Sequence, residues 1–151
     1  MPEIKVKQQS EEWHKLRKSI PLTASVFGEA IGVGKGKPGD FLRSLLDDDF
    51  ATTGVSNVFT THGHLMEPVI NEAYQLLTNR RTRQSGFWTP AHGDKLHGLV
   101  GASPDALVMD SCHEILGLAE YKAPFYKMYC RSPLLPHGIP RQYVYSISWF
   151  T

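Results

Sequence analysis

The sequence predicts an α+β fold, an α/β sandwich of helices and a sheet, formed by a single domain over residues 1–151. Three observations lead to this prediction. Apolar residues recur at helical spacing in the first half of the chain. From Ser85 the pattern changes to short β-prone runs separated by turn residues, and helical spacing returns at the end. With 151 residues, 41% of them hydrophobic, the chain is long enough to bury a core.

The first predicted helix follows Ser10, a residue type that caps helix N-termini. Trp13 and Ile20 lie at helical spacing within it, and Arg17 stands one turn beyond Trp13. Pro21 ends the helix because it cannot continue the hydrogen-bonded ladder.

Two short helices and a loop are predicted next. Thr23 can cap a helix that ends at Gly32, and a glycine-rich loop with two lysines follows over residues 32–40. Asp40 is then expected to cap a helix over residues 41–46, which a run of three aspartates closes.

The longest helical pattern runs from about residue 61 to 80, with Val69, Tyr74 and Leu77 among its apolar positions. Pro68 inside this pattern implies a kink or a late start. The basic segment 80–83 follows the helix. It could contact backbone phosphates, or it could be an ordinary exposed turn.

Four β-prone runs form the second half, at residues 86–90, 94–103, 104–110 and 114–124. A proline-punctuated, irregular stretch comes next. Residues 139–151 begin a closing helix, with Tyr143, Ile147 and Phe150 at helical spacing.

Charge and cysteine content restrict the classes of function. A net charge of +1 means that any binding to nucleic acid must come from local patches. Cys112 and Cys130 form no C-x-x-C pair, which favours a reducing intracellular setting. The N-terminus lacks an apolar signal region and no run of 18 apolar residues occurs, so we expect a protein that is neither secreted nor membrane-spanning.

Asp105, Glu120 and Lys122 are the most informative residues of the chain. Their two segments read as adjacent strands of one hairpin, and alternation along a strand places Glu120 and Lys122 on the same face. If Asp105 lies opposite, two carboxylates and an ammonium converge. Carboxylates are the ligands of Mg²⁺, and a lysine can position a water, so this arrangement predicts phosphodiester cleavage.

The alternative interpretation is a solvent-facing strand with paired charges. Three features favour the site. The strand before Glu120 is apolar, so charges at its end are costly to bury without a metal or partner. Pro104 and Pro124 stand at the limits of the two segments, and Glu67 lies upstream in a helix.

Two other patterns are weaker. The glycine-rich loop does not meet the spacing of a P-loop, because Lys35 is followed by Gly36 instead of Ser or Thr. His62, His64 and Glu67 resemble a metal cluster, but residues two apart in a helix point to different sides.

Five segments in this order, WHKLRKSIPLTAS, GHLMEP, GASPDALV, LAEYKAP and IPRQY, resemble the lambda exonuclease and viral alkaline nuclease branch of the PD-(D/E)XK nucleases. The resemblance covers roughly residues 9–145. It implies a restriction-endonuclease-like core with N-terminal helices, a central mixed sheet and a closing helix.

The resemblance also implies roles for individual residues. Asp105 and Glu120, with the backbone carbonyl of Tyr121, would bind one or two Mg²⁺ or Mn²⁺ ions, and Glu67 would complete a second site. Lys122 would orient and help deprotonate the attacking water. The residues that would hold a terminal 5′-phosphate or contact the DNA are Arg17, Ser25 and Ser103. A guanidinium and a hydroxyl at a helix start also suit a phosphate dianion on physical grounds.

The expected function is therefore a 5′-to-3′ exonuclease on double-stranded DNA ends, used in viral or phage recombination. The resemblance further implies an intracellular location, either the cytoplasm or a host nucleus, and a single-strand annealing protein as a partner. It leaves open a monomer or a ring-shaped trimer.

Departures from the family pattern keep two alternatives open. Ala123 stands where a cysteine is commoner, Ser146 and Ser148 stand where glutamines fall, and the chain stops at Thr151, where relatives continue. The alternatives are an endonuclease of the same fold, acting on DNA or RNA, and a non-catalytic DNA-binding module.

Overall fold

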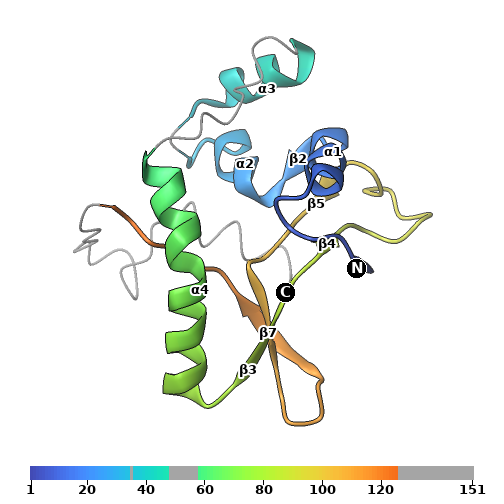
Figure 1. The fold of residues 1–151 in the computed structure, drawn as a ribbon. Coiled ribbons are helices and arrows are strands. Elements are labelled where there is room, and N and C mark those ends of the chain that lie inside the picture. The colour runs from blue at the N-terminus through green and yellow to red at the C-terminus, as the bar shows by residue number, and fades with distance from the viewer. Residues whose placement is uncertain (35, 48–57, 126–151) are drawn as a thin grey trace. The chain divides into compact units, whose positions relative to one another are not determined.

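The computed structural model describes residues 1–34, 36–47 and 58–125 (Figure 1). The chain divides into two compact units. The first contains residues 1–54, 87–103 and 129–151, and the second contains residues 55–86 and 104–128. A single domain over residues 1–151 stays a prediction.

In the first unit, helix α1 (Glu11–Ser19) forms where the sequence predicts it. The Ser10 hydroxyl accepts a hydrogen bond from the Trp13 backbone N–H at 3.2 Å, which satisfies one of the free donors of the first turn. The helix ends at Ile20, directly before Pro21. Only Trp13 of this helix is buried, so its side chain is the anchor of α1.

Helices α2 (Ala24–Ala30) and α3 (Pro38–Leu46) differ from the prediction at their starts. Thr23 precedes α2 but makes no capping hydrogen bond with its side chain. Asp40 lies inside the first turn of α3, so its predicted role as N-cap is wrong. The helix starts earlier because Pro38 at its first position has a backbone angle already suited to a helix and needs no N–H partner there.

Four short strands complete the first unit. β1 (Glu3–Ile4) pairs antiparallel with β4 (Phe87–Trp88), and β2 (Leu22–Thr23) pairs in parallel with β5 (Val100–Gly101). A bridge between Trp88 and Ala102 links the two pairs. Phe87 is fully buried and forms the centre of this core with Trp13 and Val100.

The second unit contains helix α4 (Val58–Thr78) and, beside it, a three-stranded antiparallel sheet. Helix α4 is drawn in green (Figure 1). The late start that Pro68 implied is wrong, because the helix already runs for ten residues before it. A proline inside a helix removes one backbone hydrogen-bond donor. Here ten helical residues precede Pro68 and ten follow it, and the helix continues through the proline.

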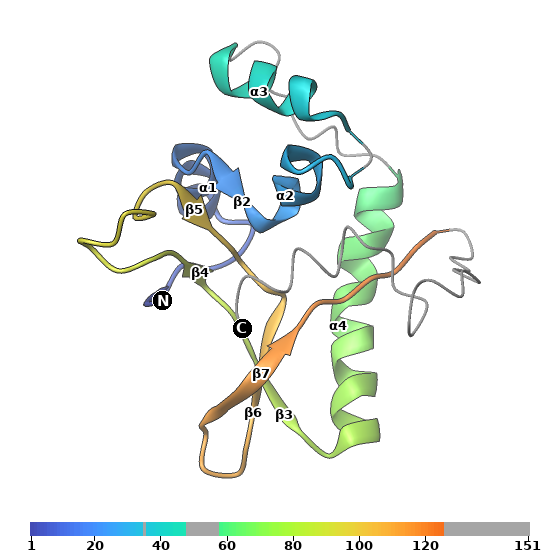
Figure 2. The same ribbon diagram turned by 180° about the vertical axis from the view of Figure 1, so that it is seen from behind.

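The sheet has the order β3-β6-β7 and consists of β3 (Arg81–Gln84), β6 (Ala106–Met109) and β7 (Ile115–Ala119). The β6–β7 hairpin confirms the predicted pairing of these two segments and is seen clearly from behind (Figure 2). The basic segment is an edge strand and not an exposed turn. It pairs because Thr82 can face helix α4 while Arg81 and Arg83 point to the opposite side.

Helix α4 directs a polar stripe toward the sheet. The half-buried positions include Glu67, Asn71 and Gln75, which are spaced by one turn. Of the apolar positions that marked the helical pattern, Tyr74 is half-buried, whereas Val69 and Leu77 are 53% and 87% exposed. Asn71 and Gln75 both accept hydrogen bonds from Thr82 of β3, and the apolar residues Met66 and Ile70 are also half-buried.

The predicted class, helices combined with a small sheet, is confirmed. Within residues 1–34, 36–47 and 58–125 the strands form three separate sheets in place of one central mixed sheet. The predicted closing helix, together with Ser146 and Ser148, lies outside the described residues. No helix in the described part has both the length and the apolar content of a membrane span.

Candidate functional site

The β6–β7 hairpin positions the two predicted carboxylates. Ala106 pairs with Ala119 at the end of the ladder, so Asp105 and Glu120 are the next residues on the two facing chains. The register of the hairpin therefore brings together two residues that are fifteen positions apart in the sequence. Asp105 directly precedes β6 and Glu120 directly follows β7, and the pairing of these short, apolar strands fixes the backbone beside both residues.

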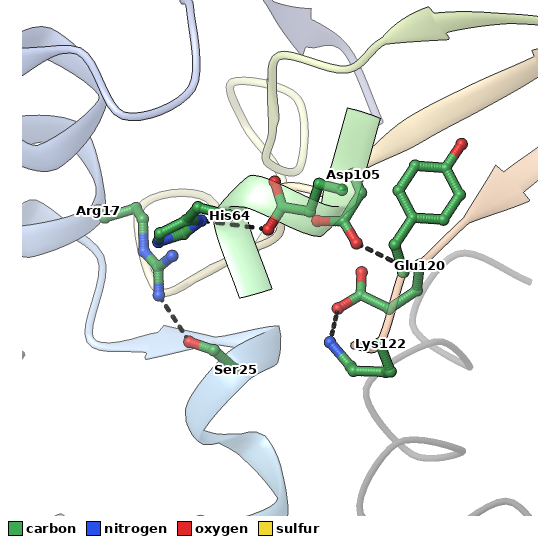
Figure 3. A network of polar contacts seen from close by, with 8 residues as sticks. Arg17, Ser25, His64, Asp105, Glu120 and Lys122 are labelled. Atoms are coloured by element: carbon green, nitrogen blue, oxygen red, sulfur yellow. Dashed lines mark hydrogen bonds and ion pairs between the residues drawn. The ribbon is translucent and has the colours of Figure 1, made fainter. Parts of the chain in front are cut away.

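Two contacts define this end of the hairpin (Figure 3). The Tyr121 backbone N–H donates to the Asp105 carboxylate at 2.5 Å. The Lys122 ammonium donates to Glu120 Oε1, also at 2.5 Å. The Lys122 and Glu120 side chains are 37% and 27% exposed, so the ion pair lies at the surface of the unit, where a substrate can reach it.

The pKa of Asp105 is raised from 3.8 to about 6. Burial is the largest cause, followed by the negative charge of Glu120. The Tyr121 N–H and the Lys122 ammonium oppose this shift, and the charge of Glu67 adds to it. Asp105 is thus a carboxylate held among other carboxylates, which a cation would stabilise in its charged form.

Glu67 lies on helix α4 close enough for its charge to act on Asp105. Its carboxylate contacts His64 Nδ1 at 3.2 Å, one turn earlier in the helix. His62 lies on another side, where its ring stands edge-on to Phe125. The two histidines therefore diverge as helical spacing predicts, and Glu67 has a histidine partner that the sequence alone did not identify.

The donor set fits a hard divalent cation. Asp105 and Glu120 offer carboxylate oxygens and the peptide after Glu120 offers a carbonyl, the ligand types that Mg²⁺ and Mn²⁺ prefer. Among the described residues, no three His, Cys, Asp or Glu side chains form a group that could hold a metal. Asp105 and Glu120 are the two side chains here that could offer oxygen ligands to an ion, and Glu67 contributes a neighbouring charge.

The residues predicted to hold a phosphate lie in the first unit. Arg17 Nη2 donates to the Ser25 hydroxyl at 2.7 Å (Figure 3). Ser25 also contacts Thr23 Oγ1 at 3.0 Å, and this hydroxyl contact explains why Thr23 does not cap α2. Arg17 is half-buried and Ser25 is exposed. The predicted pairing of a guanidinium with a hydroxyl at the start of α2 is present.

Trp13 is a site residue that sequence reasoning missed. Its indole N–H donates to the Ser103 hydroxyl at 3.0 Å, and the Arg17 guanidinium lies 4.5 Å above its ring. One buried side chain therefore contacts two of the three predicted phosphate ligands. The spacing of Trp13 and Arg17 by one helical turn was the available signal, but the contact to Ser103 spans 90 positions.

Asn71 was also missed. Its side-chain carbonyl accepts a hydrogen bond from the Tyr121 hydroxyl at 2.6 Å. The signal available in the sequence was its position one turn after Glu67 on the same face of α4.

Solved structures share this fold. The chain is similar to an alkaline exonuclease from Laribacter hongkongensis, with 24% identity and a TM-score of 0.54. A structure of that exonuclease in complex with dAMP matches with the same identity and a TM-score of 0.52. Each match covers 77% of this chain and 54% of the other, so this chain spans about half the length of those proteins.

The comparison with protein families agrees with the resemblance seen in the sequence. No curated protein matches the chain. A family model, the YqaJ-like viral recombinase domain, matches residues 12–149 and so includes every residue discussed above as a site residue. The chain belongs to the YqaJ-like viral recombinase domain family, within the lambda exonuclease-like branch that its motifs predict.

Proposed function

We propose that this chain is a deoxyribonuclease domain that hydrolyses phosphodiester bonds of double-stranded DNA with Mg²⁺ or Mn²⁺, working from a 5′-phosphorylated end in the 5′-to-3′ direction. The observation that carries the proposal is the convergence of Asp105, Glu120 and Lys122 at one end of the β6–β7 hairpin. Membership of a viral recombinase family and the fold of an alkaline exonuclease support it.

The chain's own residues have separable tasks in this reaction. Asp105, Glu120 and the Tyr121 carbonyl would hold one or two ions, with Glu67 completing a second site. A bound divalent ion supplies Lewis acidity, which lowers the pKa of a water and neutralises charge on the phosphate. The Lys122 ammonium carries three N–H donors, so it can orient the attacking water and contact a phosphate oxygen.

Asp105 must lose its proton before it can bind a metal ion. Because its pKa is about 6, Asp105 is largely charged at pH 7.5 and becomes a poor ligand as the pH falls through 6. Glu120 is neutralised by Lys122 in the metal-free protein, so an ion must share that carboxylate with the ammonium. The ionisation of Asp105 favours activity at neutral to alkaline pH.

The cluster of Arg17, Ser25 and Ser103 favours an enzyme that recognises DNA ends over an endonuclease. A terminal phosphate is a dianion with three equivalent oxygens, and a guanidinium with two hydroxyls supplies matching donors. Trp13 holds two of these groups. An internal phosphodiester carries only one negative charge and needs fewer donors. A 5′-phosphate therefore explains this cluster of donors best.

We also propose that the protein acts in viral DNA recombination inside the cell, with a single-strand annealing protein as partner. The family description supports the recombination setting. A monomer and a ring-shaped trimer are both compatible with this proposal.

End recognition is tested with linear duplexes that differ only in a 5′-phosphate or a 5′-hydroxyl. The wild type should digest the phosphorylated duplex faster, and Arg17→Ala should reduce that preference by about 10- to 100-fold because a charge-assisted contact is lost. Lys18→Ala is the matched control, since it removes a charge from the next, exposed position of α1. Equal rates on both duplexes, or cleavage of closed circular DNA at the same rate, would refute end recognition.

A further inference from the structure

We propose that Asn71 is a positioning residue of the active site, and that its side-chain carbonyl fixes the backbone segment that carries Glu120 and Lys122. The inference rests on the proposed function and extends it to a residue outside the predicted site. It concerns a polar network in the second unit that joins helix α4, strand β3 and the chain just beyond β7.

The network is centred on one oxygen atom. Asn71 Oδ1 accepts the Tyr121 hydroxyl at 2.6 Å and the Thr82 hydroxyl at 2.6 Å. An amide oxygen has two lone pairs, so these two donors use its full capacity. All three side chains are half-buried, which makes an unpaired group here costly and each of these hydrogen bonds correspondingly important.

Tyr121 is held at both of its ends. Its hydroxyl is bound to Asn71 on helix α4, and its backbone N–H is bound to the Asp105 carboxylate. The ring has only two rotatable side-chain bonds, so anchoring the hydroxyl restricts the position of the backbone. That backbone directly joins Glu120 to Lys122, and its carbonyl belongs to the donor set described above.

Helical spacing connects the same network to Glu67. Glu67, Asn71 and Gln75 follow one another at intervals of four residues and form the polar stripe of α4. Asn71 therefore sets the distance between the helix that carries Glu67 and the segment that carries Glu120. Gln75 makes a different link, because its Oε1 accepts the Thr82 backbone N–H at 3.4 Å and does not involve Tyr121.

Because Asn71 bonds to Tyr121 and Gln75 does not, variants at these positions form a matched set. Asn71→Leu removes the carbonyl while keeping a side chain branched at Cγ, Tyr121→Phe removes only the hydroxyl, and Asn71→Asp keeps an oxygen acceptor. Gln75→Met is the control, because it breaks a link between α4 and β3 while leaving the bond to Tyr121 in place.

The first measurement is hydrogen exchange of the Tyr121 amide, followed by NMR in the absence of metal and DNA. Asn71→Leu and Tyr121→Phe should each raise its exchange rate by about tenfold, the double variant should add little to either, and Asn71→Asp should restore protection. Gln75→Met should leave the rate within about twofold of the wild type.

The second measurement is Mg²⁺ affinity by calorimetry, together with kcat and KM on a linear duplex. Asn71→Leu and Tyr121→Phe should weaken Mg²⁺ binding about tenfold, as loss of a group supporting a metal ligand does, and lower kcat while KM for DNA stays constant. If Gln75→Met has the same effects, or the effects of Asn71→Leu and Tyr121→Phe are additive, Asn71 only ties the helix to the sheet and the inference is wrong.

Failure of the proposed function gives a different result. In that case the wild type itself neither binds Mg²⁺ nor cleaves DNA, and the positioning role is overturned with it. If the wild type cleaves DNA but Asn71→Leu and Tyr121→Phe change neither the exchange rate nor Mg²⁺ affinity, only the inference about Asn71 is overturned.

Discussion

At the scale of single residues, the ion pair between Lys122 and Glu120 means that metal binding and cleavage can be tested separately. Lys122 Nζ lies 2.5 Å from Glu120 Oε1. In the metal-free protein the ammonium therefore occupies a position beside Glu120 that a bound cation would also need. Under the proposed function, Lys122 would compete with an ion for Glu120 and would also supply a donor to the reaction. Metal binding and cleavage should respond differently to its removal.

Lys122→Ala is therefore expected to lower the cleavage rate by about 100- to 1,000-fold, the range found when a charge-stabilising donor is lost. Mg²⁺ affinity should stay the same or increase, because Glu120 loses its competing partner. Calorimetry and digestion of a linear duplex measure the two properties, and Lys95→Ala, at an exposed position, is the control. A wild-type rate in Lys122→Ala would show that the lysine has no catalytic role.

Asp105 predicts how the metal-free protein responds to pH. Its pKa of about 6 in the folded protein lies above the ordinary value of 3.8, because of burial and then the charge of Glu120. The folded state binds this proton more tightly than the unfolded chain, so the contribution to stability is full below about pH 4 and is lost as the pH rises through 6. The loss is at most about 3 kcal/mol.

Urea unfolding between pH 4 and 8 tests this response. The free energy of unfolding of the wild type should fall over that range relative to Asp105→Asn, and Mg²⁺ should restore it at pH 7.5 by binding the charged carboxylate. Parallel pH profiles for the two proteins would contradict the assignment of the raised pKa to Asp105.

The sequence was sufficient to predict which residues meet at the hairpin, and insufficient to predict their supports. Alternation along a strand and a short connection place Asp105 opposite Glu120 with few alternatives. The contacts of Trp13 with Ser103 and of Asn71 with Tyr121 span 90 and 50 positions. Such contacts depend on how separate elements pack, and no local periodicity encodes them.

At the scale of elements, strand β5 requires a glycine at position 101. A Cβ atom there would lie 2.4 Å from the fully buried Phe87 ring, so the ring or the strand would have to shift. Gly101→Ala should therefore lower the free energy of unfolding by about 1–3 kcal/mol through overpacking.

Gly39→Ala is the matched control, because nothing lies within 4 Å of the Cβ position and the residue is in the first turn of α3. It should be neutral or slightly stabilising. Chemical denaturation compares the two variants with the wild type. An unchanged stability of Gly101→Ala would mean that the Phe87 ring can shift away at little cost.

Helix α4 shows why an apolar pattern can mislead. Its periodicity predicted the existence of the helix, but Val69 and Leu77 are exposed while Asn71 and Gln75 face the sheet. Thr82 and Tyr121 supply the partners for that polar stripe, and they come from distant segments. The strand Arg81–Gln84 was not predicted for the same reason, since its pairing depends on β6.

At the scale of the whole molecule, the candidate site residues divide between the two units. The carboxylates and Lys122 belong to the second unit, and Arg17, Ser25 and Ser103, which are predicted to bind a phosphate, belong to the first. The five sequence segments nevertheless predicted the family, because an ordered set of five motifs is far more specific than any one of them. The extent of the strands was predicted less well, since two-residue strands leave almost no periodic signal.

The most direct measurement is the hydrolysis of a linear duplex by pure wild-type protein and by Glu120→Gln over a range of Mg²⁺ or Mn²⁺ concentrations. Glutamine keeps the size of the side chain and removes the charge that an ion requires. The account predicts metal-dependent turnover by the wild type that a chelator abolishes, and a rate at least about 100-fold lower in Glu120→Gln. DNA binding by the wild type without turnover at any metal concentration, or an equal rate in Glu120→Gln, would contradict it.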